Sequence, residues 1–234
     1  LLFLQIDPEN AQDAAAVDSL SGYGLAVPIN RFDHMYEDVY NPERAGLIIN
    51  CLNGVYDLGR NAFQPADRRD LCIQQAAVCY NKDATAPRWE ACLQQWFTNP
   101  DSGQVDVELI RYVQAALGYA CFGQVTDEGM WFHVGEGRNG KSTMMNLIKR
   151  LLGSYAILVS HTVLTGDDKT ASAGMLDEMA NMRGKRLILS SETDVRDVIN
   201  SAMLKKLADR TIIRTKFMRE KTFEFVPTGK LHLS

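Results

Sequence analysis

Residues 135–142 have the types and spacing of a loop that binds phosphate. They read Gly-Glu-Gly-Arg-Asn-Gly-Lys-Ser and fit the pattern G-x-x-x-x-G-K-[ST]. Glycines let the backbone curl so that successive N–H groups point inward, and a following helix adds the positive end of its dipole. Lys141 can reach the β- and γ-phosphates, and the Ser142 hydroxyl can join the shell of Mg²⁺. We predict a site for ATP and Mg²⁺ made of Gly135, Glu136, Gly137, Arg138, Asn139, Gly140, Lys141, Ser142 and Thr143.

The same glycines also fit G-x-G-x-x-G, the pattern of a dinucleotide site. Such a site needs an acidic residue about 20 residues further on, at the end of the next strand, to hold ribose. Here residues 156–160 lead to His161 and Thr162, and the next acids are Asp167 and Asp168. A dinucleotide site also leaves the Lys-Ser pair without a role, so the phosphate loop is the better interpretation.

An acidic residue that could complete the site follows a second apolar segment. Residues 187–189 are a short apolar run without polar alternation, which is typical of a strand buried on both faces. Nucleotide hydrolysis needs an acid at the end of a neighbouring strand to position Mg²⁺ and polarise water. We predict that Glu192 is this catalytic and metal-binding acid, with Asp194 as the second choice. The alternative is an ordinary surface glutamate.

The elements that must position these residues alternate between strands and helices. Apolar spacing predicts helices near 89–97, 108–122, 141–152, 169–182 and 195–208, and strands near 46–52, 55–58, 130–134, 187–189 and 211–226, the last as a hairpin turning at 218–220. Leu109, Tyr112, Val113, Ala116 and Leu117 are expected on one buried face of their helix. Strands separated by helices predict an α/β fold with a mainly parallel sheet flanked by helices, preceded by a small mixed α/β domain.

Composition places the chain among globular proteins. Its 234 residues are 46% hydrophobic and 23% charged, without an apolar stretch long enough to cross a bilayer, so we expect no membrane association. The five cysteines lack zinc-site spacing and are expected to be buried thiols in a cytosolic protein. Residues 1–128 hold 8 basic and 18 acidic residues, whereas residues 129–234 hold 17 and 11, so the second half is the one expected to meet phosphate or nucleic acid.

The ordered motifs resemble a known family. The loop has the form Gly-x-Gly-x-Asn-Gly-Lys-Ser, its helix ends in Leu-Leu-Gly-x-Tyr at 151–155, and Gly-Lys-Arg begins the segment 184–192 that reaches Glu192. Upstream, residues 53–58 read Asn-Gly-Val-Tyr-Asp-Leu. Over roughly residues 46–234 the chain resembles superfamily 3 helicases of the phage/plasmid primase-helicase type, which are related to poxvirus D5-like nucleoside triphosphatases.

The resemblance implies a fold and an activity. It implies a P-loop NTPase core of AAA+-like type over residues 126–234 and a small domain over residues 46–125. The segment over residues 1–45 stays unassigned. It implies an ATP-driven DNA helicase that acts in phage, prophage or plasmid replication in the bacterial cytoplasm. Such proteins commonly form hexameric rings around single-stranded DNA, translocate 3′ to 5′ and carry a primase on the same polypeptide.

Two departures from the family pattern affect these expectations. Residues 204–209 reach Asp209 without the glycine that usually precedes it. Residues 230–234 look like the start of the third motif, whose polar sensor would follow Ser234. We therefore expect a fragment that is cut at both ends and lacks part of its catalytic machinery.

Seven Lys or Arg residues lie between residues 205 and 221, against Asp209 and Glu220. Proteins that move along a single strand hold backbone phosphates with positive groups and do not read sequence. The resemblance implies that this hairpin faces the central pore of a ring. We predict that Lys216, Arg219 and Lys221 contact DNA; a solvated strand pair is the alternative.

Two other functions remain open from the sequence. One is another P-loop enzyme, such as a small-molecule kinase, which would need an acceptor pocket and an Arg-rich lid. The other is a truncated product that binds nucleotide or partner subunits without turnover. Stimulation of ATP hydrolysis by single-stranded DNA would separate the helicase from both.

Overall fold

The computed structural model describes residues 47–67, 70, 72–135, 139–165, 172–190, 200–209 and 211–233. In this part of the chain, the main sheet has four parallel strands in the order β4-β9-β6-β5. The strands are β4 (Met130–Phe132), β5 (Ala156–Val159), β6 (Leu187–Ser190) and β9 (Lys230–Leu233). Because all four run in one direction, their carboxyl ends meet at one edge of the sheet, where ligands of open α/β folds bind.

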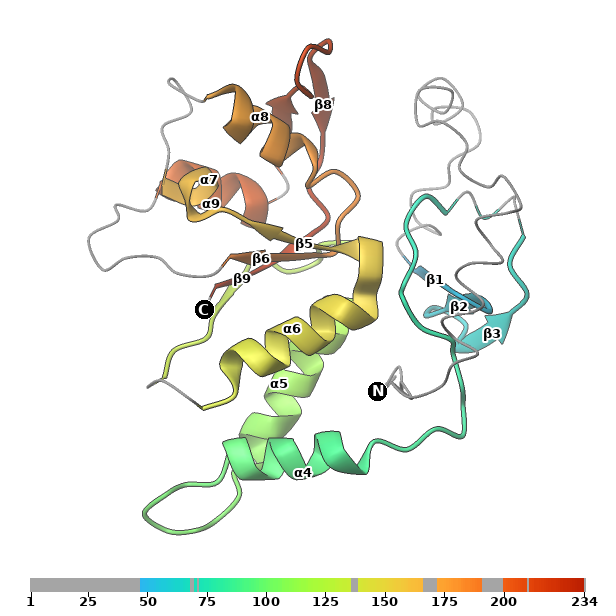
Figure 1. The fold of residues 1–234 in the computed structure, drawn as a ribbon, viewed down its shortest axis with the longest axis vertical. Coiled ribbons are helices and arrows are strands. Elements are labelled where there is room, and N and C mark those ends of the chain that lie inside the picture. Colours follow the sequence, from blue (N-terminus) through green and yellow to red (C-terminus); the bar gives the residue numbers. More distant parts are fainter. Residues whose placement is uncertain are drawn as a thin grey trace.

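Helices cover both faces of this sheet (Figure 1). α5 (Val107–Tyr119) and α6 (Lys141–Leu152) lie on one face, and α7 (His161–Thr165), α8 (Ala173–Ala180) and α9 (Ser201–Ala208) lie on the other. The strand β6 is apolar on both faces and therefore needs helices on both. Leu187 and Leu189 pack with α6, whereas Ile188 packs with α7, α8 and α9. The prediction of an α/β fold with a parallel sheet buried between helices is confirmed.

A second, antiparallel sheet precedes the parallel one. It contains β1 (Ile48–Cys51), β2 (Gly54–Asp57) and β3 (Ala62–Gln64) in that order. The Asn-Gly turn joins β1 to β2, as predicted, whereas β3 was not predicted. Residues 72–80 form no strand or helix, but they lie along β1, with the amide of Ala76 donating to the carbonyl of Asn50 at 2.8 Å.

Helix α4 (Pro87–Trp96) links this sheet to α5. Both helices form where apolar spacing predicts them, and Asp106 caps α5 by accepting a hydrogen bond from the amide of Leu109 at 2.9 Å. The prediction that the α5 stripe is wholly buried is wrong, because Leu109 is 41% and Tyr112 60% exposed. Their half of α5 extends beyond the sheet, and only the half with Ala116 and Leu117 is buried.

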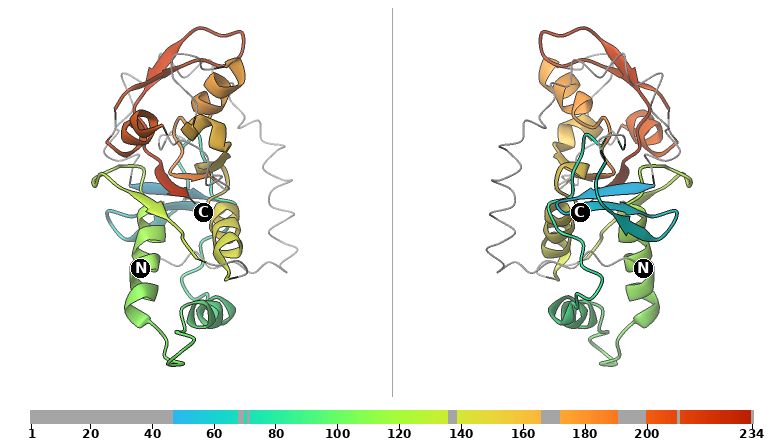
Figure 2. Two further views of the ribbon diagram at one scale, coloured as in Figure 1. Left: turned by 90° about the vertical axis from the view of Figure 1, so that its left-hand side faces the viewer. Right: turned by 90° about the vertical axis from the view of Figure 1, so that its right-hand side faces the viewer.

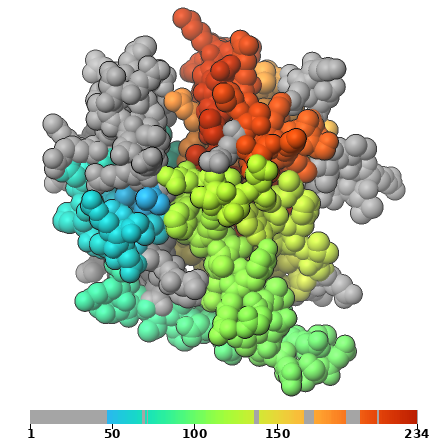
Figure 3. Space-filling model, turned by 180° about the vertical axis from the view of Figure 1, so that it is seen from behind, coloured from blue at the N-terminus to red at the C-terminus, as the bar shows by residue number. Residues whose placement is uncertain are grey.

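The last hairpin consists of β7 (Ile213–Thr215) and β8 (Phe223–Phe225), paired antiparallel as predicted. It projects past α8 at one end of the long axis, and α4 lies at the other end (Figures 1 and 2). Seen from behind, the surface of residues near 110–130 adjoins both the antiparallel sheet and the hairpin (Figure 3). None of the helices in the described part of the chain has the length and apolar character that crossing a bilayer requires.

Candidate functional site

The loop with the phosphate-binding pattern connects β4 to α6 at the carboxyl edge of the parallel sheet. Gly135 and residues 139–143 are described, whereas Glu136, Gly137 and Arg138 lie outside the described residues. Helix α6 begins at Lys141, and its cap is Gly140, with a left-handed backbone at φ 87°. The helix therefore begins where the motif requires, with the hydroxyls of exposed Ser142 and Thr143 in its first turn.

The Lys141 ammonium lies within the loop. Its Nζ donates to the carbonyl of Gly135 at 2.6 Å and to Oδ1 of Asn139 at 3.0 Å. These contacts draw the two ends of the loop together around a positive charge. An ammonium held by neutral loop oxygens is placed to exchange them for the oxygens of an anion, because an anion is the stronger hydrogen-bond acceptor.

Two glycines of the loop are closely approached by neighbouring side chains, and Gly140 also has a backbone conformation that favours glycine. A Cβ on Gly135 would collide with the Asn139 side-chain amide and lie 3.4 Å from Nζ of Lys141. At Gly140, a Cβ would lie 2.5 Å from Nε1 of Trp96, and the left-handed backbone would be strained in any other residue. Small residues at these two positions let the described ends of the loop approach Lys141 and Trp96 closely.

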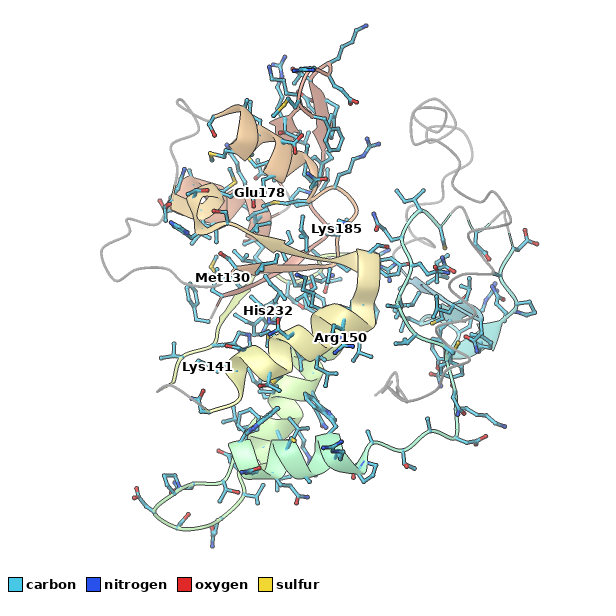
Figure 4. The ribbon with its side chains drawn as sticks, viewed as in Figure 1. Met130, Lys141, Arg150, Glu178, Lys185 and His232 are labelled. Atoms are coloured by element: carbon cyan, nitrogen blue, oxygen red, sulfur yellow. The ribbon has the colours of Figure 1, made fainter. Side chains whose placement is uncertain are left out.

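Two histidines contact each other between β4, the strand before this loop, and its neighbour β9. Nε2 of His133, after β4, lies 3.0 Å from Nδ1 of His232 in β9, and the His232 ring stacks on Trp131 at 4.8 Å between centroids. His232 lies between the sheet and α6 (Figure 4). Burial and the neighbouring His133 lower the pKa of His232 to about 3, and burial and the charge of Lys141 lower the pKa of His133. Both rings therefore stay neutral near pH 7.

This histidine pair was not predicted from the sequence. Nε2 of His232 is buried and has no hydrogen-bond partner among the described residues. The available signal was a histidine at the end of each of two apolar segments, and only the pairing of β4 with β9 shows that they meet.

The predicted acid Glu192, and Asp194 with it, lie outside the described residues. The strand that leads to them, β6, is buried as predicted, with Ser190 as its last residue. The expectation that this strand neighbours the one before the phosphate loop is wrong, because β9 lies between β4 and β6. The reason is that the last described strand enters the middle of the sheet and hydrogen-bonds to both.

Another carboxylate lies at the same edge of the sheet. Oε1 of Glu178, on α8, accepts a hydrogen bond from the amide of Ser160, just after β5, at 2.8 Å. It ties α8 to the carboxyl end of β5. Among the described residues, no group of three or more His, Cys, Asp or Glu side chains is close enough to hold a metal ion.

The predicted DNA-contacting residues are exposed on the β7–β8 hairpin. Lys216, Arg219 and Lys221 are all exposed, and Arg219 lies at the tip with a left-handed backbone. The other side of the hairpin is buried, with Ile213 and Phe225 in the core. The hairpin is tied to α8, because the amide of Met218 donates to Oδ1 of Asp177 at 3.1 Å.

Two buried cations at the opposite edge of the parallel sheet were also missed. Arg186, just before β6, donates to the carbonyls of Cys121 at 2.7 Å and Ile48 at 2.5 Å. Lys230 donates to the carbonyls of Phe122, Gln124 and Thr228. These hydrogen bonds attach the residues before position 125 to the start of the parallel strands. Burial and the charge of Arg186 lower the pKa of Lys230 to about 7.

Comparison with known proteins gives a family match over part of the chain. A family model described as D5 N terminal like matches residues 38–98. This range contains the described parts of the antiparallel sheet, the segment 72–80 and α4. It ends before the phosphate loop begins.

Three curated viral proteins are similar in sequence. "Putative helicase L207/L206" of Acanthamoeba polyphaga mimivirus is 24% identical over 197 residues, 81% of this chain and 19% of that protein. "Putative helicase 022R" of Frog virus 3 is 34% identical over 112 residues, 46% of this chain and 11% of that protein. "Putative helicase 184R" of Invertebrate iridescent virus 6 is 25% identical over 163 residues, which are 68% of this chain and 16% of that protein. The chain spans about a fifth or less of the length of these relatives.

Among solved structures, the chain is similar to two apo structures of the NrS-1 C-terminal region. One aligns with a TM-score of 0.46 and 13% identity over 63% of this chain and 33% of that chain. The other, an A form, aligns with a TM-score of 0.45 and 12% identity over 63% of this chain and 32% of that chain.

Proposed function

We propose that this chain is part of the ATP-hydrolysing core of a DNA helicase. The observation that carries the proposal is the loop between β4 and α6, where Gly140 caps the helix with a left-handed backbone and the Lys141 ammonium is held by oxygens of Gly135 and Asn139. The loop lies at the carboxyl edge of a parallel sheet, which is where open α/β folds bind nucleotides. The relatives' names support a helicase rather than a kinase or a binding fragment.

The described residues fit MgATP. Lys141 is placed to bind the β- and γ-phosphates once they replace its loop oxygens, and the first-turn amides of α6 present the positive end of the helix dipole. Ser142 would hold Mg²⁺, which neutralises the developing charge on the phosphates when it is bound. We assign Glu192 to the same site because it follows β6 by two residues, and β6 ends at this edge.

The finer assignment is a P-loop NTPase of superfamily 3, of the D5-like primase-helicase type. It is supported by the order of the motifs and by the family match over residues 38–98. A hexameric ring and a primase on the same polypeptide belong to the same proposal. The phage or plasmid origin stays a prediction, since the relatives named above come from other viruses.

We place single-stranded DNA on the β7–β8 hairpin. Lys216, Arg219 and Lys221 give its exposed surface three positive charges, and its buried side anchors it to α8. Because Asp177 of the anchor is followed by Glu178, which contacts the end of β5, α8 connects the hairpin to the nucleotide edge of the sheet.

The test is ATPase activity of a full-length protein with and without single-stranded DNA. We expect DNA to stimulate hydrolysis and Lys141→Ala to abolish it. Arg150→Ala is the matched control, since it removes an exposed positive charge from the other end of α6 and should leave hydrolysis unchanged.

Other results would favour other functions. Hydrolysis that ignores DNA but transfers phosphate to a small acceptor would favour a kinase. Nucleotide binding without turnover in the full-length protein would favour a binding fragment. Unchanged hydrolysis in Lys141→Ala would end the assignment of the phosphate loop.

A further inference from the structure

Helix α6 is held at both ends by residues that precede β4 in the sequence. At its first end, Trp96 of α4 packs against Gly140. At its last end, the carbonyl of Leu151 accepts a hydrogen bond from the amide of Ala77 at 3.1 Å. Trp96 and Ala77 both lie within residues 38–98, the range of the family match. The helix that carries the phosphate loop therefore depends on this preceding region for its position.

The contact at Gly140 is the closer of the two to the candidate chemistry. A Cβ on Gly140 would lie 2.5 Å from Nε1 and 2.6 Å from Cδ2 of the indole, so the ring lies directly on the glycine Cα. Gly140 is the cap of α6, and its carbonyl accepts the hydrogen bond from the amide of Met144 at 2.9 Å. The indole thus touches the residue at which the loop becomes a helix.

The indole is itself held in place. Trp89, earlier on α4, meets Trp96 edge to face with 5.9 Å between ring centroids. Both rings pack against the buried cluster that includes Met144 and Met145 of α6. Trp96 therefore links the core under α6 to the backbone of the phosphate loop.

We propose that Trp96 is a positioning residue for the phosphate loop. A glycine in the left-handed region has many other conformations open to it, and each would turn the neighbouring amides and Lys141 away from the candidate site. The indole blocks those conformations, so that less ordering is required when a triphosphate binds. The proposal rests on the proposed function, and it gives the region matched by the D5 N terminal like model a role in nucleotide binding.

The first test does not depend on nucleotide. Amide hydrogen exchange is measured in the 234-residue chain and in Trp96→Ala, Trp96→Phe and Tyr112→Ala. We expect faster exchange at residues 139–145 in Trp96→Ala and recovery in Trp96→Phe, which keeps a ring against Gly140. Tyr112→Ala is the control, because it removes an exposed ring of α5 that is not part of the cluster around Trp96.

The second test measures affinity for a fluorescent ATP analogue in the same proteins. Trp96→Ala should weaken binding roughly tenfold, since small misplacements of binding groups carry costs of this order or more, while Tyr112→Ala stays near the unsubstituted protein. The chain has three tryptophans, so combining Trp89→Phe with Trp131→Phe leaves Trp96 as the single tryptophan. Its emission should change when MgATP is added, and should not change when Lys141→Ala is also present.

The outcomes separate the two proposals. Unchanged exchange and unchanged affinity in Trp96→Ala would overturn the positioning role while nucleotide binding by the unsubstituted protein upholds the proposed function. Faster exchange in a protein that binds no nucleotide would overturn the proposed function and leave Trp96 as a support of α6 alone. Equal effects of Trp96→Ala and Tyr112→Ala, without recovery in Trp96→Phe, would also overturn the positioning role.

Discussion

His133, which follows β4, and His232 of the neighbouring strand β9 contact each other through their side chains, with 3.0 Å between Nε2 of the first and Nδ1 of the second. The two residues are 99 positions apart in sequence. One ring donates to the other, so the hydrogen bond needs at least one neutral imidazole with a free lone pair. Protonating both would end it and would place two positive charges beside Lys141.

Acid should therefore destabilise the protein through His232. Its pKa is about 3 in the folded state and near 6.5 when unfolded, so between these values only the unfolded state binds the proton. The free energy of unfolding should fall as pH falls through this window, by at most about 1.4 kcal/mol per pH unit. Urea unfolding of the wild type and His232→Phe from pH 7 to pH 4 measures the difference, and parallel curves would refute the prediction.

Lys230 should make the free energy of unfolding depend on pH above neutrality, whereas His232 does so below it. Its pKa is lowered from 10.5 to about 7 by burial, so between these values the unfolded state binds more protons and stability should rise with pH. The thiol of Cys51 and the phenol of Tyr155, whose pKa values burial raises to about 12, reverse this trend only above pH 9 and pH 10 respectively. Urea unfolding from pH 7 to pH 9 should show the wild type gaining stability relative to Lys230→Met. A constant difference would contradict the shift.

Gly153→Ala should destabilise the fold by about 2 to 3 kcal/mol, because φ 53° with ψ −124° suits only glycine. A Cβ there would also lie 2.6 Å from the carbonyl oxygen of Gln75 and 2.8 Å from the amide of Ala77. Thermal unfolding measures the loss. Gly174→Ala, in the first turn of α8 with space around it, is the matched control and should change stability by less than about 1 kcal/mol.

Lys216→Ala combined with Lys221→Ala should weaken binding of single-stranded DNA and make it less sensitive to salt. Removing two phosphate contacts should reduce the slope of log affinity against log salt by about 1.4. Fluorescence anisotropy at several salt concentrations measures the slope, and ATP affinity should not change. Lys82→Ala with Arg88→Ala removes the same charge from exposed positions elsewhere and serves as the control. Equal slopes in both double variants would argue against DNA on the hairpin.

Much of the local structure could be read from the sequence. The glycines around Lys141, the turn at Asn53-Gly54 and the apolar run at Leu187 predict a loop, a hairpin and a buried strand, and all three are present. These features depend on the conformations open to a few neighbouring residues, so short patterns are enough to specify them.

Parts of the site were less accessible to prediction. Ser142 and Lys216 were identified from motif and charge, and their exposure is compatible with their predicted contacts. Glu192 stays a prediction. The pair His133–His232 and the carboxylate of Glu178 were missed, because nothing near each of them in the sequence marks its partner.

Residue types and spacing alone were enough to predict a loop with the phosphate-binding pattern between a strand and the helix that begins at Lys141. Three other features follow from the folded chain: β9 separates β4 from β6, Arg186 reaches the carbonyl of Ile48, and Trp96 lies on Gly140. The two groups differ in the distance along the chain over which the responsible interactions act. Turn and helix preferences act over a few residues, whereas strand order and side-chain neighbours are set by how the whole chain buries its apolar surface and satisfies its buried polar groups.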